Sequence, residues 1–415
     1  MHSVQEALAV VLRDAEPLGE EVVPLGKALD RVLARDVSSP IAIPPWDNAS
    51  MDGYAVRAAD VAAASAATPV VLAVVGTVAA GGHFSANVEP GTAVRIMTGA
   101  PIPPGADSVI RIEDTDRGIE RVTILDARDA GRNVRARGED LRDGQIALAA
   151  GTVIGPAQLG VLASVGAAAL HVHRVPTVAV MSSGDELVDI DRFSEVLAGA
   201  RIVSSNGYTL RAAVRQSGAA ILDLGLVADD RAAISKAMRR GVECDLIITS
   251  GGVSAGAFDH TRDVVRGLGG DIRIERVRMR PGAPLGFGMI RNTPWIGLPG
   301  NPVSALVTFE LFARPLIRML RGERRLFPVP VPVVVDEDIV LAAPLTHFLR
   351  AIVALGEDGL LHARLTGSQG SGLLTSMARA NALLIIPSDH EAVRRGASAR
   401  ALLLGGGLLA DHATL

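Results

Sequence analysis

Three apolar segments constrain the fold of this chain more than any other feature. They are Val178 to Met181, Leu246 to Ile248 and Trp295 to Leu298, and each stops abruptly at a polar, glycine-containing loop. A short apolar run bounded by turn residues is typical of a buried strand. We therefore expect three buried strands, each of which delivers a polar loop.

Helical patterns alternate with these strands. Leu210 and Val214 fall at helical spacing before Gly218, a further strand is expected over 221–227, and a second helix over 230–240. This alternation predicts a parallel sheet with helices on both faces. Ligands bind outside the carboxyl ends of the strands in such sheets. The three polar loops should then face one crevice.

Length and charge narrow the class of protein. The 415 residues exceed what a single core usually holds, so two to four domains are expected. A formal charge of −4 provides no basic field for nucleic acid. The only lysines, Lys27 and Lys236, lie away from the polar loops in sequence, which argues against lysine nucleophiles and Schiff bases.

A single cysteine, Cys244, leaves no partner for a disulfide or a thiolate metal site and suits a reducing compartment. The first residues do not form a signal region, and no apolar stretch reaches membrane-spanning length. We expect a cytoplasmic protein with no membrane partner.

The chain outside the central unit is organised differently. Ser3 and Glu6 form a capping-box pattern that predicts an opening helix, and a second short helix is expected over 28–33. Short β-type runs occupy 46–140, and helical periodicity returns over 151–173. A long helix is expected from Val303 to Leu320, capped by Asn301 with Pro302 in its first turn; a β-rich segment follows.

All three polar loops carry groups that suit phosphates or metal ions. Asp185 and Glu186 offer the carboxylate oxygens that Mg²⁺ prefers, although solvated acids at a helix start are an equally ordinary reading. Gly251 and Gly252 allow close backbone approach, and Ser254 can receive an anion. A simple turn is the commoner case, but Asp259 adds a carboxylate nearby. Gly300, Asn301 and Ser304 form a third anion candidate, although helix capping explains Asn301 equally well.

Three polar stretches lie outside the central unit. Residues 46–55 combine an aromatic residue with several turn formers, Thr98 ends a strand, and residues 135–140 mix arginines with acids. Arginine forks suit oxyanions. Ordinary turns and a charged surface loop are the alternative readings.

Taken together, these stretches resemble successive signatures of the molybdopterin molybdenumtransferases, the MoeA and gephyrin E-domain family. The resemblance covers nearly the whole chain and is weakest after Arg321, where Phe348-Leu349-Arg350 and Gln369-Gly370-Ser371 remain. The motifs are Ser50-Met51-Asp52-Gly53-Tyr54-Ala55, Met97-Thr98-Gly99-Ala100-Pro101, Arg137-Gly138-Glu139-Asp140, Ser183-Gly184-Asp185-Glu186-Leu187, Ser250-Gly251-Gly252-Val253-Ser254 and Gly297-Leu298-Pro299-Gly300-Asn301-Pro302.

The resemblance implies a multidomain α/β plus β protein that forms an elongated homodimer. Its central domain is a doubly wound α/β unit of the molybdopterin-binding type. The implied domains are a discontinuous helical domain (1–40 and 141–174), an inserted β domain (41–140), the α/β domain (175–325) and a C-terminal, β-barrel-like domain (326–415).

The resemblance also implies the reaction and the site. Adenylylated molybdopterin and molybdate are converted to molybdenum cofactor and AMP with Mg²⁺, in a cleft between the α/β domain of one subunit and the β domain of the other. An adenylyltransferase and cofactor-accepting enzymes are expected protein partners. The implied catalytic residues are Asp52, Thr98, Asp140, Glu186, Asp229 and Asp259, with Glu186 and Asp259 on the metal; the implied substrate-binding residues are Gly251, Gly252, Ser254, Arg280, Gly300, Asn301, Pro302, Arg350 and Ser371.

One departure from the family pattern leaves alternatives open. Ala283 stands where the family commonly has a lysine in Pro-Gly-Lys-Pro, and we expect Arg280 to compensate for the lost charge. A paralogue that handles tungstate is compatible with this change. An adenylyltransferase would need the α/β domain alone, and a non-enzymatic scaffold is the least favoured reading because the acids are retained.

Overall fold

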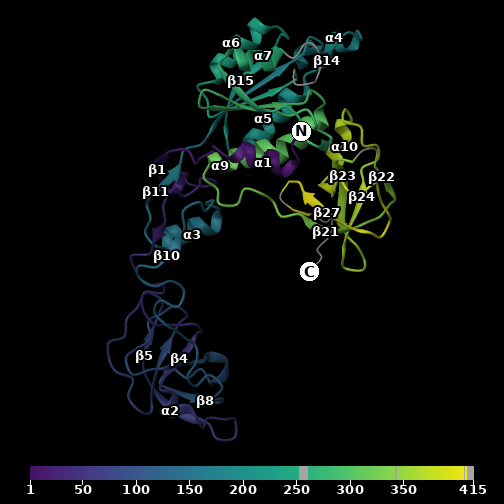
Figure 1. The fold of residues 1–415 in the computed structure, drawn as a ribbon. Coiled ribbons are helices and arrows are strands. Elements are labelled where there is room, and N and C mark those ends of the chain that lie inside the picture. Colours follow the sequence, from purple (N-terminus) through teal and green to yellow (C-terminus); the bar gives the residue numbers. More distant parts are fainter. Residues whose placement is uncertain (252–259, 342–343, 406, 409–415) are drawn as a thin grey trace.

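The computed structural model describes residues 1–251, 260–341, 344–405 and 407–408. The chain is elongated: a β domain lies at one end, the α/β domain and the C-terminal β domain lie side by side at the other, and a narrow segment joins them (Figure 1). None of the helices in the described part of the chain is both long and apolar enough to cross a bilayer.

The central sheet confirms the expected parallel strands. Its order is β15 (Ala220–Val227), β12 (Thr177–Ser183), β16 (Leu246–Ser250), β20 (Thr293–Leu298), β19 (Gly286–Ile290) and β17 (Gly270–Ile274). The first four strands run parallel, and β19 and β17 extend the sheet through two antiparallel pairings, β19 with β20 and β17 with β19. The carboxyl ends of β12, β16 and β20 therefore meet at one edge.

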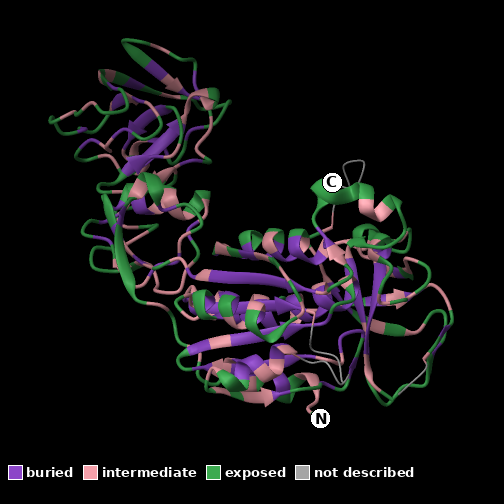
Figure 2. Cartoon of the chain, turned by 90° about the horizontal axis from the view of Figure 1, so that it is seen from above, coloured by how far each residue is buried: buried purple, intermediate pink, exposed green. Residues whose placement is uncertain are grey.

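Helices cover both faces of this sheet, as the alternation of patterns predicts. Along β12, Val178 packs into the same core as α5 (Ser205–Gln216), whereas its neighbour Ala179 packs into a second core with α6 (Arg231–Gly241) and α7 (His260–Gly267). Successive strand residues point to opposite faces, so each face has its own core. Figure 2 shows buried residues along the strands and exposed residues on the outer sides of the helices.

The long helix that follows β20 is confirmed, with one irregularity. It consists of α8 (Pro302–Thr308), a π-helical segment η4 (Phe309–Ala313) and α9 (Arg314–Leu320). Pro302 occupies the first turn as expected. Asn301 holds the N-cap position, but its side chain makes no capping hydrogen bond and donates to Ser371 instead.

The opening helix is confirmed, but it belongs to the central core. α1 (Val4–Leu12) has the complete capping box of Ser3 and Glu6, and its buried residues Ala7 and Val11 pack with α5 and α9 residues. α3 (Pro156–Ser164) is the only α-helix that the structure describes between residues 13 and 57 or between 141 and 174. The hydrophobic cluster around α3 contains no residue of α1.

The prediction of a second short helix over 28–33 is wrong. A 3₁₀ turn, η1, covers Leu25–Lys27, and Asp30 adopts a left-handed backbone conformation (φ 60°) that ends any helix there. Leu33 instead bridges to Val172 and is fully buried. The expected helical stretch 151–173 also ends in a strand, since β11 (Ala169–His173) pairs with β1 (Glu20–Pro24). The four domain boundaries remain predictions.

The two β domains contain the predicted short strands. The inserted domain has a five-stranded sheet in the order β7 (Ser108–Arg111), β4 (Gly53–Val56), β6 (Thr92–Ile96), β5 (Val70–Val78) and β8 (Arg121–Ile124). In the C-terminal domain, pairing of β23 with β25 closes a barrel. Its strands are β23 (Thr346–Leu355), β24 (Leu361–Leu365), β21 (Val331–Val335), β27 (Ser398–Leu403) and β25 (Ala382–Ile386), and β18 (Met279–Arg280) adds to β23 from the α/β side.

The packing of α1 predicts the effect of a charge in this helix. An uncompensated buried charge costs about 3–5 kcal/mol, so Ala7→Asp should drive α1 out of the central core. We expect faster hydrogen exchange over residues 4–12 and a lower urea midpoint. Ala9→Asp places the same charge on the exposed face of the same helix and should change neither strongly. Equal exchange in both variants would contradict the packing of α1.

Candidate active site

A cavity of about 680 Å³ lies at the carboxyl edge of the central sheet. The register aligns Ser182 with Ser250 and Ser250 with Leu298, so the loops after β12, β16 and β20 emerge together. The predicted crevice is therefore present. Its lining residues are Ser183, Gly184, Glu186, Leu187, Ile202, Val203, Ser204, Ser205, Asn206, Asp229, Ser250, Gly251, Pro284, Pro299, Gly300, Asn301, Pro302, Gly372 and Leu374.

Two carboxylates line this cavity from different loops. Glu186 follows β12, and Asp229 follows β15 and accepts a hydrogen bond from the Ser183 hydroxyl at 3.2 Å. Asp185 does not line the cavity; its Oδ1 accepts from the Asp229 backbone N–H at 3.2 Å. The neighbouring acids thus have different positions, one facing the cavity and one holding the Asp229 loop.

The carboxylates of Glu186 and Asp229 fit a hard divalent cation, which takes oxygen ligands and keeps several waters. Within the described residues no three acidic, histidine or cysteine side chains converge as a metal cluster. Asp259, the other predicted ligand, lies outside the described residues, as do Gly252 and Ser254.

Glycines bring the loops close to one another. Gly251 has φ +94°, and a Cβ there would lie 2.2 Å from the Ser183 carbonyl oxygen, so only glycine fits. A Cβ on Gly300 would lie 3.8 Å from the Gly251 Cα. The backbone around Gly251 and Gly300 therefore borders the cavity without intervening side chains, which suits close approach of an anion.

Asn206 connects these loops, and the sequence reasoning did not single it out. Its Nδ2 donates to Ser250 Oγ at 2.7 Å and to the Gly300 carbonyl at 2.8 Å. The available signal was the pattern itself: Ser204, Ser205 and Asn206 follow a short strand, β14 (Ile202–Val203), as the other polar loops follow theirs. Four other lining residues were also not predicted from the sequence to belong to the site; they are Leu187, Pro284 and the two residues of β14.

The C-terminal domain contributes one wall. Asn301 Nδ2 donates to Ser371 Oγ at 3.0 Å, the Val303 N–H donates to the Ser371 carbonyl at 3.1 Å, and Gly372 and Leu374 line the cavity. Predicted residues Asn301 and Ser371 are thus brought into contact, although they lie far apart in the sequence.

Arg350 lies behind this wall, fully buried in β23. Its Nε donates to Ser376 Oγ at 3.1 Å and its Nη2 to the Gly370 carbonyl at 3.0 Å, while Nη1 has no hydrogen-bond partner among the described residues. No described carboxylate pairs with it, and burial lowers the pKa of Arg350. An arginine buried without an acid is suited to receiving an oxyanion.

Arg280 lies in β18, where it pairs with His347 of the C-terminal barrel. Its side chain is exposed and does not line the cavity, although Pro284 on the same segment does. The structure therefore places Arg280 at the junction of two domains, and its predicted role in substrate binding stays a prediction.

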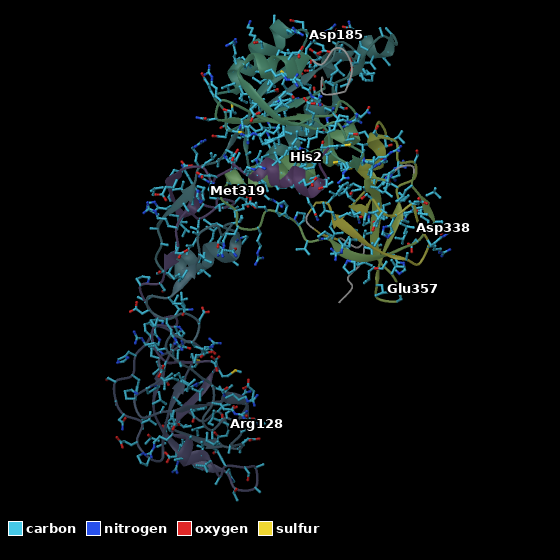
Figure 3. All side chains as sticks on the ribbon, in the orientation of Figure 1. His2, Arg128, Asp185, Met319, Asp338 and Glu357 are labelled. Carbon is cyan, nitrogen blue, oxygen red and sulfur yellow. The ribbon has the colours of Figure 1, made fainter. Side chains whose placement is uncertain are left out.

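The predicted residues Asp52, Thr98 and Asp140 lie away from the cavity, toward the opposite end of the molecule. Asp52 Oδ1 accepts from the Thr98 backbone N–H and hydroxyl, both at 2.7 Å, and these bonds hold the pKa of the Asp52 carboxyl below its usual value. Asp140 lines a separate, shallow hollow with Glu139. In Figure 3 the inserted β domain, which carries Arg128, lies at the opposite end of the molecule from Asp185. One chain does not bring the two groups together.

Comparison with known families matches three consecutive parts of the chain. Residues 2–166 match the MoeA N-terminal region (domain I and II), residues 179–319 match the probable molybdopterin binding domain, and residues 332–404 match the MoeA C-terminal region (domain IV). These ranges cover the β domain, the cavity and the barrel.

Individual relatives match over nearly the full length. Molybdopterin molybdenumtransferase 2 of Mycobacterium tuberculosis is 40% identical over 411 residues, covering 95% of this chain and 98% of its own length. The Nostoc enzyme is 37% identical over 91% of this chain and 87% of its own. A crystal structure of the molybdopterin biosynthesis moeA protein from Pyrococcus horikoshii OT3 superimposes with a TM-score of 0.83 at 29% identity, covering 97% of this chain and all of that one. The chain belongs to the MoeA family of molybdopterin molybdenumtransferases.

Proposed function

We propose that this chain transfers molybdenum from molybdate to adenylylated molybdopterin and releases AMP, in a Mg²⁺-dependent reaction. The observation that carries the proposal is the single cavity in which Glu186, Asp229 and the Gly251 and Gly300 backbone meet. Carboxylates for a metal ion and a side-chain-free backbone for phosphates suit a substrate that contains a pyrophosphate.

The proposed reaction consumes one water and releases two. Cleavage of the phosphoanhydride bond consumes one water and leaves AMP and the terminal phosphate of the pterin. The two dithiolene sulfurs replace two oxygens of molybdate, which leave as two waters with protons from the thiols and the solvent. No electron is transferred, and the net products are molybdenum cofactor, AMP and one water.

Glu186 and Asp229 are the described residues that would hold Mg²⁺, with Asp259 as the further predicted ligand. When bound, the ion would offset charge on the phosphates of the substrate. Ser183 supports this arrangement, because its hydroxyl orients the Asp229 carboxylate.

Arg350 and Ser371 are the proposed oxyanion contacts. The unpartnered Nη1 of Arg350 offers a charge-assisted donor, and the Gly370 carbonyl that accepts from Nη2 precedes Ser371 in the cavity wall. Molybdate has the charge and acceptor oxygens that such a guanidinium binds. Tungstate has the same charge and shape, so the same contacts can bind either oxyanion.

A second subunit would complete the site. The distal residues Asp52, Thr98 and Asp140 cannot reach the cavity of their own chain, but a two-fold dimer can bring the β domain of one subunit to the cavity of the other. The site would then be assembled from two chains.

Replacing one cavity acid should abolish most turnover. Asp229→Asn is expected to lower AMP release from adenylylated molybdopterin on the order of 100-fold, as for the loss of one electrostatic contact, and to raise the Mg²⁺ concentration needed. Asp230→Asn is the matched control, because the described contacts of the Asp230 carboxylate are the capping bonds that it accepts from Ala232 and Ala233. Asparagine caps a helix about as well as aspartate, so this variant should keep both its stability and its turnover. Equal rates for Asp229→Asn and wild type would reject the metal role.

Arg350 should control oxyanion affinity. Arg350→Met is expected to raise the half-saturating molybdate concentration about 10- to 100-fold, the range of one charged hydrogen bond, and Arg350→Lys should recover part of it. A titration of AMP release with molybdate and with tungstate measures this and identifies the preferred oxyanion. Arg364→Met, on the exposed side of β24, is the control. An unchanged molybdate half-saturation in a folded Arg350→Met protein would contradict the assignment.

The shared site predicts complementation between two inactive variants. When Asp52→Asn and Glu186→Gln are mixed and exchange subunits, half of the dimers contain one subunit of each variant. One of the two sites in such a dimer is intact, so about one quarter of wild-type activity should return. A mixture of Asp52→Asn with Thr98→Ala should stay inactive, because both changes lie in the β domain. Failure of the first mixture, with exchange verified, would place the whole site in one chain.

A further inference from the structure

Three buried oxygen atoms, on two residues that line the cavity and one that adjoins its lining, have no hydrogen-bond partner among the described residues. They are Ser182 Oγ, Ser204 Oγ and Asn206 Oδ1, on residues that are only 2%, 6% and 7% exposed. They come from two different elements and from the loop that precedes α5. Buried polar atoms almost always have partners, so a group of unpaired ones needs an explanation.

Their arrangement follows from the fold. Ser182 continues the face of β12 that Val178 and Val180 present to α5. A Cβ on Gly207, in the first turn of α5, would lie 3.3 Å from Ser204 Oγ and 3.6 Å from Ser182 Oγ. The two hydroxyls therefore flank the Gly207 backbone, and Ser204 also lines the cavity.

The orientation of the Asn206 amide is determined by its neighbours. Both Nδ2 hydrogens are engaged, by Ser250 Oγ and by the Gly300 carbonyl. The opposite orientation would place Oδ1 against the Gly300 carbonyl oxygen, and two acceptors repel each other. Oδ1 is therefore the free acceptor, on a residue that lines the cavity.

The group is uncharged. The nearest guanidinium nitrogen, Arg211 Nη1, lies 3.9 Å from the Cβ position of Gly207 and is paired with Asp223 at 2.7 Å. An amide oxygen can only accept hydrogen bonds, so it disfavours phosphate or molybdate oxygens and favours an N–H donor. Serine hydroxyls can donate or accept.

We propose that Ser182, Ser204 and Asn206 form a neutral subsite that binds the N–H edge of a heterocycle in the substrate. This inference rests on the proposed function and deepens it. The proposed substrate has two such heterocycles. A pterin offers an amino group, a ring N–H and a carbonyl in a row, whereas adenine offers an amino group beside a ring nitrogen. The pterin edge matches one acceptor and two hydroxyls more completely, so we expect the pterin here.

The test uses variants that lose no internal hydrogen bond. Neither hydroxyl has a hydrogen-bond partner in the part of the chain that the structure describes, so Ser182→Ala and Ser204→Ala should keep the melting temperature of the wild type or raise it. Each should weaken binding of free pterin about threefold to tenfold, the usual range for one neutral hydrogen bond. Pterin fluorescence titration measures this. Lumazine, which has an oxygen in place of the 2-amino group, should bind the wild type more weakly.

Ser217→Ala provides the opposite control. Ser217 is buried away from the cavity, and its hydroxyl donates to the Ala213 carbonyl at 2.7 Å and accepts from Arg314 at 2.8 Å. This variant should lower the melting temperature and leave pterin binding unchanged. Opposite effects in the two sets of serines would separate ligand binding from folding.

Parallel titrations with AMP distinguish the two sources. Weaker pterin binding with unchanged AMP binding supports the subsite and assigns it to the pterin; the reverse supports it and assigns it to adenine. If Ser182→Ala and Ser204→Ala bind both ligands as the wild type does, ordered water fills the space and the inference is overturned. AMP release by the wild type is measured separately, so loss of the proposed function would appear there and not in the serine comparison.

Discussion

The parallel pairing of β12, β16 and β20 is the constraint on which the rest of the structure depends. Ser182, Ser250 and Leu298 lie in register, so three loops from distant parts of the sequence leave the sheet at one edge. Apolar side chains along the strands point alternately into the two cores, one on each face of the sheet, and this packing keeps the strands in that register. A slip of one residue would reverse both faces, so packing of the cores also determines where the cavity lies.

The cavity is joined to the C-terminal barrel by a short set of polar contacts. Asn301 and Ser371 connect the start of α8 to the loop before α10 (Leu374–Arg379), and β18 adds to the barrel through β23. Arg350 lies fully buried beneath that loop, held by serine and carbonyl oxygens in place of a carboxylate. The barrel thus holds a buried guanidinium behind the wall that it contributes to the cavity.

The elongated shape explains why the polar motifs are spread over the whole sequence. The inserted β domain carries the Asp52–Thr98 pair far from the cavity of its own chain, and the segment of β1, β10 (Ile146–Leu148), α3 and β11 separates them. Hydrogen bonds fasten this segment to the end of α9: Arg321 donates to the Asp30 carbonyl, and the Arg324 N–H donates to the Gly151 carbonyl at 3.3 Å.

The sequence by itself determined the elements whose signals are local: the apolar strands, the capping box at Ser3, the helices after Asn206 and Asp230, and the motifs that resemble the family. The tertiary structure decided that α1 joins the central core, that residues 28–33 are not a helix, that Asn301 contacts Ser371, and that Glu186 but not Asp185 lines the cavity. It also brought Asn206 to Gly300. Periodicity and capping depend on neighbours within a few residues, whereas a side chain's hydrogen-bond partner depends on segments that only folding brings close.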